Sequence, residues 1–180
     1  MLEADKTALI VIDIQDILMP KEGSIAKTFL DKTTKLIQCA HVLEIPVLTT
    51  EQNPEKLGAT NARVQEALGE YTGLSKLAFS CWANAGFREA VKASGKTQLL
   101  IIGMETHICV MQTVLECLEA GYEPFVVRDA VLSTRKEEYR AGLQRMEKAG
   151  ATIVTTQMSI FELLRAAGTP AFRKMLPLLK

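Results

Sequence analysis

The sequence is poor in the residues that mark several classes of protein. Its 180 residues include only two histidines and four cysteines. The cysteines show no CxxC spacing, and the histidines stand far apart; the residues are Cys39, Cys81, Cys109, Cys117, His41 and His107. These absences argue against a disulfide framework and against a zinc site, so we expect no bound metal.

Long apolar runs and an excess of one charge are also missing. The N-terminal apolar run spans only Ala8 to Ile12 and follows acidic residues, unlike a secretory signal or a transmembrane helix. Lys plus Arg and Asp plus Glu both number 21, so no basic stripe could neutralise a row of phosphates. We therefore expect a soluble cytoplasmic protein, an organellar location in a eukaryote being left open, that binds neither membranes nor nucleic acid. A local basic patch is still compatible with the balanced charge.

Two glycine motifs that bind phosphates are absent as well. A dinucleotide-binding fold has GxGxxG directly after its first strand, whereas residues 13–16 read DIQD. The phosphate-binding loop GxxxxGKS or GxxxxGKT does not occur either, which argues against kinases and GTPases. We therefore expect no cofactor.

Apolar, largely β-branched runs alternate with helical patterns along the chain. The runs cover residues 7–14, 47–50, 74–79, 99–102, 123–127 and 151–155, and the clearest helical patterns cover 28–43, 85–93, 109–120 and 135–149. This alternation predicts an α/β fold in one domain over residues 1–180. We expect a three-layer α/β/α, doubly wound, Rossmann-like architecture with a mainly parallel six-stranded sheet.

Cys109 stands where a strand gives way to a helix. The strand LLII ends at Gly103, and a helical pattern begins at Cys109. If the strand is central and parallel, the thiol lies on the first helical turn, where the helix dipole lowers the thiol pKa toward the thiolate. A reactive nucleophile is one interpretation. A buried, inert cysteine is the other, because free cysteine is among the most buried residue types.

Two charged residues lie at or near the ends of other predicted strands. Asp13 interrupts TALIVIDI near its end, and Lys76 lies in LSKLAF. Taken separately, Asp13 suits a structural acid that binds backbone N–H groups, and Lys76 suits an edge-strand lysine that points to solvent. Since parallel strands share one carboxyl edge, both can instead converge on Cys109. The carboxylate would then accept the thiol proton and return it to a leaving amine, while the ammonium would stabilise both anions.

Over essentially its full length the sequence resembles the isochorismatase-like superfamily of cysteine hydrolases. Four segments carry the resemblance: LIVIDIQD, TEQNPEKLG, SKLAFSCW and GMETHICVMQTVLECLEAGYEPFVVRDAV. The resemblance implies a catalytic triad of Asp13, Lys76 and Cys109. It also implies a cis peptide between Met104 and Glu105, which would aim the backbone N–H groups of Glu105 and Cys109 at a developing oxyanion.

Two departures from the superfamily narrow the expected function. Nicotinamidase-like members carry an Asp and two His metal ligands after the second strand, where this chain has Gln52, Asn53 and Pro54. Members that act on isochorismate hydrolyse a vinyl ether without a thiol, so the presence of Cys109 points to amide or related C–N hydrolysis. The segments TEQNP and KLAFSCW resemble the subgroup of isochorismatase-domain proteins whose substrates are unassigned.

These observations predict a metal-independent cysteine hydrolase of small amide-like substrates that works through a thioester on Cys109. His107 is expected at a structural or pocket-rim position, because residues two apart on a helix do not face each other. Further pocket candidates, chosen for their place near the same sheet edge, are Gln15, Gln52, Phe79, Trp82 and Ile108. Trp82 could equally fill the core.

Two other classes of function stay open. The fold could serve as a catalytically silent binding or scaffold protein, or the protein could act on nucleic acid, which the balanced charge disfavours. Apolar residues of the C-terminal tail suit packing on the domain or on a neighbouring subunit; they include Leu176, Leu178 and Leu179. We therefore expect a homo-oligomer with a small-molecule substrate.

Overall fold

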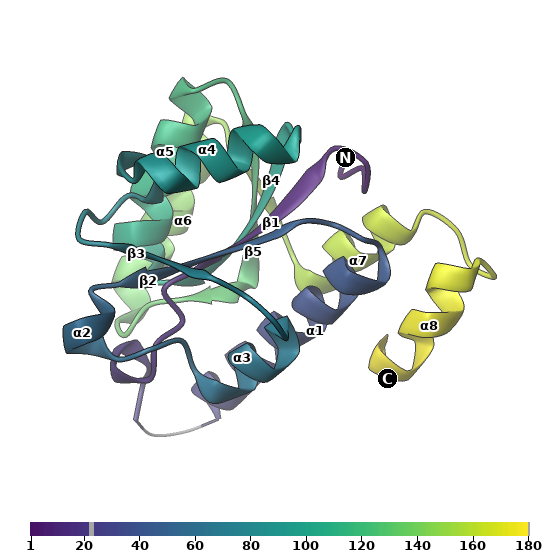
Figure 1. Cartoon of the computed structure of the whole chain (residues 1–180), viewed down its shortest axis with the longest axis horizontal. Coiled ribbons are helices and arrows are strands. Elements are labelled where there is room, and N and C mark those ends of the chain that lie inside the picture. The colour runs from purple at the N-terminus through teal and green to yellow at the C-terminus, as the bar shows by residue number, and fades with distance from the viewer. Residues whose placement is uncertain (22–23, 180) are drawn as a thin grey trace.

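A central parallel sheet organises the structure, a computed structural model that describes residues 1–21 and 24–179. Within these residues the sheet has six strands in the order β3-β2-β1-β4-β5-β6, and every neighbouring pair is parallel (Figure 1). The strands are β1 Thr7–Ile12, β2 Val47–Gln52, β3 Gly73–Lys76, β4 Gln98–Met104, β5 Glu123–Leu132 and β6 Thr152–Val154. The predicted α/β class and parallel six-stranded sheet are confirmed.

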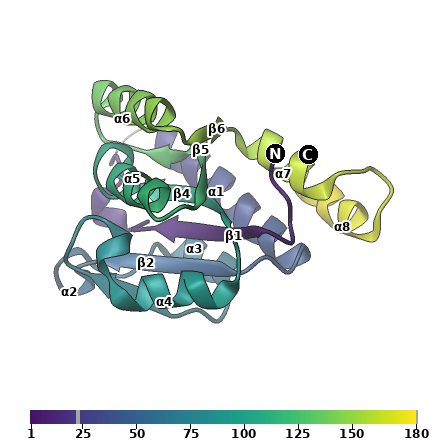
Figure 2. The same cartoon turned by 90° about the horizontal axis from the view of Figure 1, so that it is seen from above.

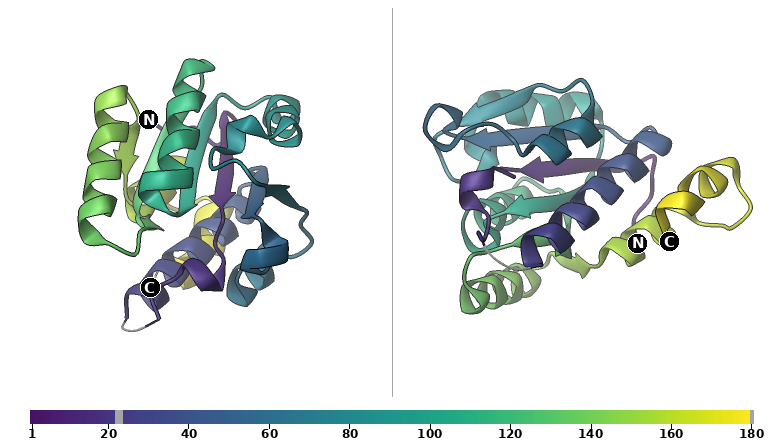
Figure 3. Two further views of the ribbon diagram at one scale, coloured as in Figure 1. Left: turned by 90° about the vertical axis from the view of Figure 1, so that its left-hand side faces the viewer. Right: turned by 90° about the horizontal axis from the view of Figure 1, so that it is seen from below.

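Helices cover both faces of this sheet and complete the three layers (Figure 2). One face packs against α1 Ile25–Val42, α3 Ala62–Leu68 and α7 Thr156–Leu164, and the other against α4 Ala85–Ser94, α5 Met111–Glu119 and α6 Lys136–Ala149. Shorter elements are η1 Asp16–Leu18, α2 Pro54–Leu57, η2 Cys81–Ala83 and the π-helical turn η3 Thr106–Val110. The C-terminal helix α8 Pro170–Leu179 stands out from the rest of the fold (Figure 3), with Met175 buried in the core on the α1 face.

The two central strands explain why the fold is doubly wound. Every residue of β1 and of β4 is buried, because helices cover both faces of these strands. On β1, Ala8, Ile10 and Ile12 belong to the core beneath α4, α5 and α6, whereas Leu9 and Val11 belong to the core beneath α1. An unbroken apolar run is therefore the correct signal for these strands.

Strands β3 and β5 do not end at their predicted residues. Strand β3 ends at Lys76, and residues 77–79 leave the sheet. Strand β5 continues to Leu132, with an irregular register against β4 near Ile101 and Gly103. Strand pairing and local hydrogen bonding set these ends, and the apolar pattern of the sequence does not indicate them.

Gly103 brings β1 and β4 unusually close at their carboxyl ends. Its φ angle is +129°, and a Cβ atom added there would lie 2.0 Å from the Ile12 carbonyl oxygen. Only glycine fits such an approach. The residues that follow the two strands, Asp13 on one and η3 on the other, are thereby held next to each other.

No helix among residues 1–21 and 24–179 combines the length and apolar character needed to cross a membrane.

Candidate active site

Asp13 follows β1 directly and is fully buried. Its backbone adopts a left-handed conformation with φ 48°, which turns the chain away from the strand. One carboxylate oxygen, Oδ2, accepts a hydrogen bond from Lys76 Nζ at 2.6 Å, and the other, Oδ1, accepts one from Thr50 Oγ1 at 2.8 Å. Both oxygens thus have a donor, as a buried carboxylate requires.

Lys76 ends the edge strand β3, yet its side chain points inward and is 1% exposed. The solvent-facing alternative is therefore wrong for this lysine. Its ammonium group also donates to Gln52 Oε1 at 2.6 Å and to the carbonyl oxygens of Phe79 and Ala78 at 2.9 and 3.3 Å. The Asp13 charge raises the pKa of Lys76 against the effect of its burial. A buried ion pair is costly to build and still more costly to break.

The Cys109 thiol lies beside this ion pair and is 5% exposed. Its Sγ donates toward Gln52 Oε1 at 3.9 Å. Burial raises the pKa of Cys109 to about 12, and the negative charge of Asp13 acts in the same direction, whereas Lys76 opposes it. The prediction of a lowered thiol pKa is therefore wrong. Desolvation outweighs the helix terminus here, because Cys109 is the fourth residue of η3 and not an exposed residue of a first α-helical turn.

The backbone before Cys109 is held by its neighbours. The peptide bond between Met104 and Glu105 is cis. The Glu105 carboxylate accepts hydrogen bonds from the Thr134 N–H and hydroxyl at 3.0 and 2.9 Å. On the far side α6 packs so closely that a Cβ atom at Gly142 would lie 3.0 Å from His107 Cα. The turn that carries the thiol is thus clamped between the β5–α6 loop and α6.

Gln52 and Gln15 have different places from those expected of pocket residues. The Gln52 amide oxygen lies between Lys76 and Cys109, and its Nε2 donates to the Leu77 carbonyl at 2.8 Å. Gln15 is fully buried. Its amide holds the Gln52 backbone from both sides, at 2.9 and 3.0 Å, and also donates to Gly58. Gln15 therefore holds the backbone of Gln52 in place.

The three other pocket candidates differ in their surroundings and exposure. Trp82 is half-buried and packs edge-to-face on Phe87 and Tyr122, with ring centroids 5.7 and 5.1 Å away, so its ring lies against the core. Phe79 is 53% exposed, and its carbonyl binds Lys76. Ile108, next to Cys109, is half-buried. Phe79 and Ile108 therefore remain candidates for contact with a substrate.

His107 points to the loop after β5. Its Nδ1 lies 3.0 Å from the Ser133 hydroxyl. This contact suits the predicted structural or rim position.

Two hydroxyl groups of the site were not predicted. Thr50 binds Asp13 and lies 3.5 Å from the Cys81 sulfur. Thr113, one turn after Cys109 on α5, donates to the Cys109 carbonyl at 2.7 Å and accepts from the Cys81 N–H at 2.9 Å. Thr50 carried a usable signal, since it is a polar residue at the carboxyl end of a buried strand. Thr113 carried none, because threonine is unremarkable in a helix.

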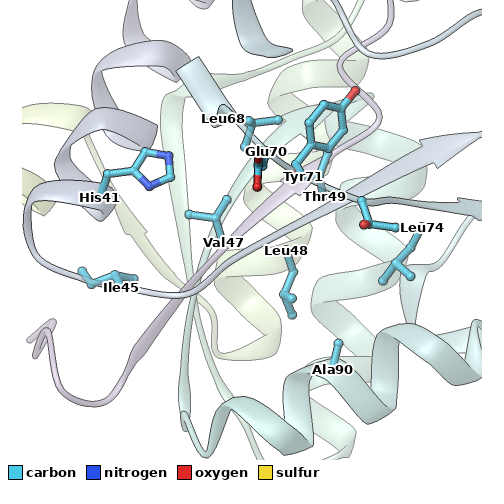
Figure 4. A pocket seen from close by; sticks show the side chains of 11 residues that line it. His41, Ile45, Val47, Leu48, Thr49, Leu68, Glu70, Tyr71, Leu74 and Ala90 are labelled. Atoms are coloured by element: carbon cyan, nitrogen blue, oxygen red, sulfur yellow. The ribbon is translucent and has the colours of Figure 1, made fainter. Parts of the chain in front are cut away.

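A cavity of about 400 Å³ lies away from this site, beside the amino-terminal half of β2 (Figure 4). Val47, Leu48 and Tyr71 are among its lining residues. Gln52 marks the opposite end of the same strand. The cavity therefore has no part in the chemistry of Cys109.

Metal ligands do not gather near Gln52. Among residues 1–21 and 24–179, no group of three or more His, Cys, Asp and Glu side chains is placed to hold a metal ion. Gln52 itself binds Lys76 through its amide oxygen, so the atom best placed to be a ligand already has a cationic partner.

Known proteins share this fold and sequence pattern. Residues 7–158 match the isochorismatase domain. The secreted isochorismatase effector Isc1 of Phytophthora sojae is 30% identical over 178 residues, covering 97% of this chain and 84% of that protein. The structure of the MAR1 ribonuclease of Caenorhabditis elegans is 30% identical with a TM-score of 0.91, covering 99% of this chain and 91% of that one. The YcaC gene product of Escherichia coli, an octameric hydrolase of unknown specificity, is 25% identical with a TM-score of 0.85, covering 99% and 86% of the respective chains.

Proposed function

The chain belongs to the isochorismatase family, whose fold supports a hydrolase, and from that premise we propose a metal-independent cysteine hydrolase of small amide-like substrates. The observation that carries the proposal is the buried contact of a carboxylate, an ammonium group and a thiol at one sheet edge. Asp13 Oδ2 lies 2.6 Å from Lys76 Nζ. The Cys109 thiol and the Lys76 ammonium group both contact Gln52 Oε1. A purely structural core would be cheaper with apolar side chains at these positions.

The raised thiol pKa assigns the proton steps in this mechanism. Cys109 is protonated at neutral pH, so Asp13 takes the proton as Sγ attacks the substrate carbonyl carbon. The backbone N–H groups of Glu105 and Cys109 stabilise the oxyanion. Asp13 then returns the proton to the leaving amine, and a thioester remains on Cys109. Water activated by Asp13 cleaves the thioester and restores the thiol.

Lys76 acts electrostatically in the same steps. Its ammonium group donates a hydrogen bond to Asp13, and its positive charge favours the negative charge that develops on the sulfur. Because four acceptors surround it, Lys76 stays in place without a substrate. No metal is needed in this scheme, since the amide oxygen of Gln52 serves Lys76. Metal analysis of the purified protein and full activity after chelation test this part; activity lost to a chelator and restored by one metal would contradict it.

Homo-oligomeric assembly and a cytoplasmic location are further parts of the proposal. The octameric YcaC relative supports a homo-oligomer for this chain. A cytoplasmic location stays a proposal, and one relative is named a secreted effector. Sedimentation of the purified protein and imaging of the tagged full chain would test them.

A panel of small amides tests the catalytic proposal directly. The protein is mixed with each amide and quenched, and intact-mass and peptide spectra are searched for an acyl group on Cys109. We expect turnover and an adduct in the natural chain, neither in Cys109→Ser, and both in the control Cys117→Ser. If Cys109→Ser retains turnover, the thioester mechanism is wrong. If no amide reacts, the silent scaffold is favoured.

Action on RNA is the second candidate, because one relative is named a ribonuclease. RNA of mixed sequence is incubated with the natural chain and with Cys109→Ser. Under the amide hydrolase proposal, neither cleaves RNA. RNA cleavage by the natural chain that is lost in Cys109→Ser would contradict the amide hydrolase proposal. Cys109 would then belong to a ribonuclease site.

A further inference from the structure

A second charged region lies where α6 meets β5 and the edge strand β6. Figure 2 shows these three elements next to one another. A groove of about 420 Å³ runs there, of a size that suits a small ligand. Its walls come from one face of α6 and from β5 and β6; they are Arg128, Lys136, Tyr139, Arg140, Leu143, Gln144, Glu147 and Ile153. In the described part of the chain, none of these residues belongs to the triad or forms a hydrogen bond or ion pair with it.

The cations of the groove are exposed and available. Arg128, Lys136 and Arg140 are all exposed. Within residues 1–21 and 24–179, none of the three forms an ion pair with an acidic side chain. The Tyr139 hydroxyl donates to the Arg128 carbonyl, which ties the strand that carries Arg128 to the first turns of α6. Three positive charges from two elements are thus held at one end of the groove in a chain of zero net charge.

The rest of the groove has a different character. Leu143 is buried and Ile153 half-buried, so the floor is apolar. Glu147 lies seven residues after Arg140 on the same helix face, which places it about 10 Å along the axis. The groove therefore offers cations at one end, an apolar middle, and an acceptor at the other end.

We infer that this groove binds a small organic anion of about mononucleotide size, with its phosphate at Arg128, Lys136 and Arg140. Arginine suits a phosphate because its planar group donates two parallel hydrogen bonds. A flat body would lie on Leu143 and Ile153, and Glu147 would accept from an amino or hydroxyl group. Electrostatic attraction alone would hold inorganic phosphate, so the apolar floor is what selects a phosphate ester. This inference is independent of the proposed hydrolase function.

Titration calorimetry at low salt with adenosine 5′-monophosphate, adenosine and inorganic phosphate tests the site. We expect the monophosphate to bind at least tenfold more tightly than either adenosine or phosphate. Arg128→Gln and Arg140→Gln should each weaken its binding at least tenfold. Arg145→Gln, an exposed cation of α6 outside the groove, should change it less than twofold. Glu147→Gln should weaken the monophosphate but not inorganic phosphate.

Several results would overturn the inference. They are monophosphate binding absent at millimolar concentration, binding unchanged in Arg128→Gln and Arg140→Gln, and binding that protects Cys109 from iodoacetamide. Dissociation of an oligomer by Arg140→Gln, followed by sedimentation, would instead make the groove a contact between subunits. Circular dichroism of each variant separates these results from loss of fold, which exposed substitutions should not cause.

Discussion

Two charged regions of this protein place their cations in opposite ways. At the carboxyl edge of the sheet, Lys76 is buried and has four acceptors, including Asp13. In the groove between β5 and α6, Arg128, Lys136 and Arg140 are exposed and form no ion pair within the described part of the chain. A buried charge needs a partner of opposite charge even without a substrate, because the cost of its desolvation is otherwise not compensated. An exposed charge is solvated by water and needs no protein partner before a ligand binds. The first arrangement suits chemistry, and the second suits binding.

The largest expected effect comes from breaking the buried pair. Lys76→Met removes the ammonium partner of the fully buried Asp13, so the free energy of unfolding should fall by about 3 to 5 kcal/mol. Any hydrolysis should also disappear. Lys136→Met removes an exposed cation of α6 and is the matched control, with a change within about 0.5 kcal/mol. Urea unfolding measures both; equal effects of the two variants would contradict the contrast.

Gly103 tests how the buried region is held together. Gly103→Ala places a methyl group 2.0 Å from the Ile12 carbonyl, so the strands must separate at the site. We expect a loss of at least about 2 kcal/mol in unfolding free energy. Gly150→Ala, after α6, has a positive φ of 113° but its nearest neighbour atom is 3.9 Å away, so it should cost only about 1 kcal/mol. Gly103→Ala as mild as Gly150→Ala would show that the approach is not needed.

The alkylation rate of Cys109 distinguishes the effect of neighbouring charges on the free thiol from their effect on catalysis. With a thiol pKa of about 12, the thiolate fraction and the iodoacetamide rate at Cys109 should rise about tenfold per pH unit from pH 7 to 10. Asp13→Asn removes the anion that raises this pKa, so Cys109 should be alkylated faster at pH 8 while amide turnover is lost. Lys76→Met should slow the alkylation. Peptide mass spectrometry gives the rates, and slower labelling in Asp13→Asn would show that Asp13 activates the resting thiol.

The smallest effect is expected in the exposed region. Arg140→Gln should change the unfolding free energy by less than about 0.5 kcal/mol, because the side chain is exposed and lacks an ion pair in the described part of the chain. Amide turnover should stay unchanged. Thermal unfolding and a turnover assay check both, and a marked loss of either would link the groove to the buried site.

The same contrast explains which parts of the site were predictable. Asp13 and Lys76 were conspicuous because each is a charge in or beside an apolar strand, and parallel topology brings strand ends together. The surroundings of Gln15 and Trp82 were not predictable, because position near an edge does not say which way a side chain points. Gln15 turned to backbone groups and Trp82 to aromatic neighbours.

By itself the sequence determined the layered α/β fold, the parallel sheet and the family, because burial on both faces leaves unbroken apolar runs between amphipathic helices. Only the tertiary structure decided the charge states. The Cys109 thiol is protonated, and Lys76 is buried, because desolvation and neighbouring charges depend on residues distant in the chain. The α6 groove likewise exists only where Arg128 of β5 meets Lys136 and Arg140 of the helix.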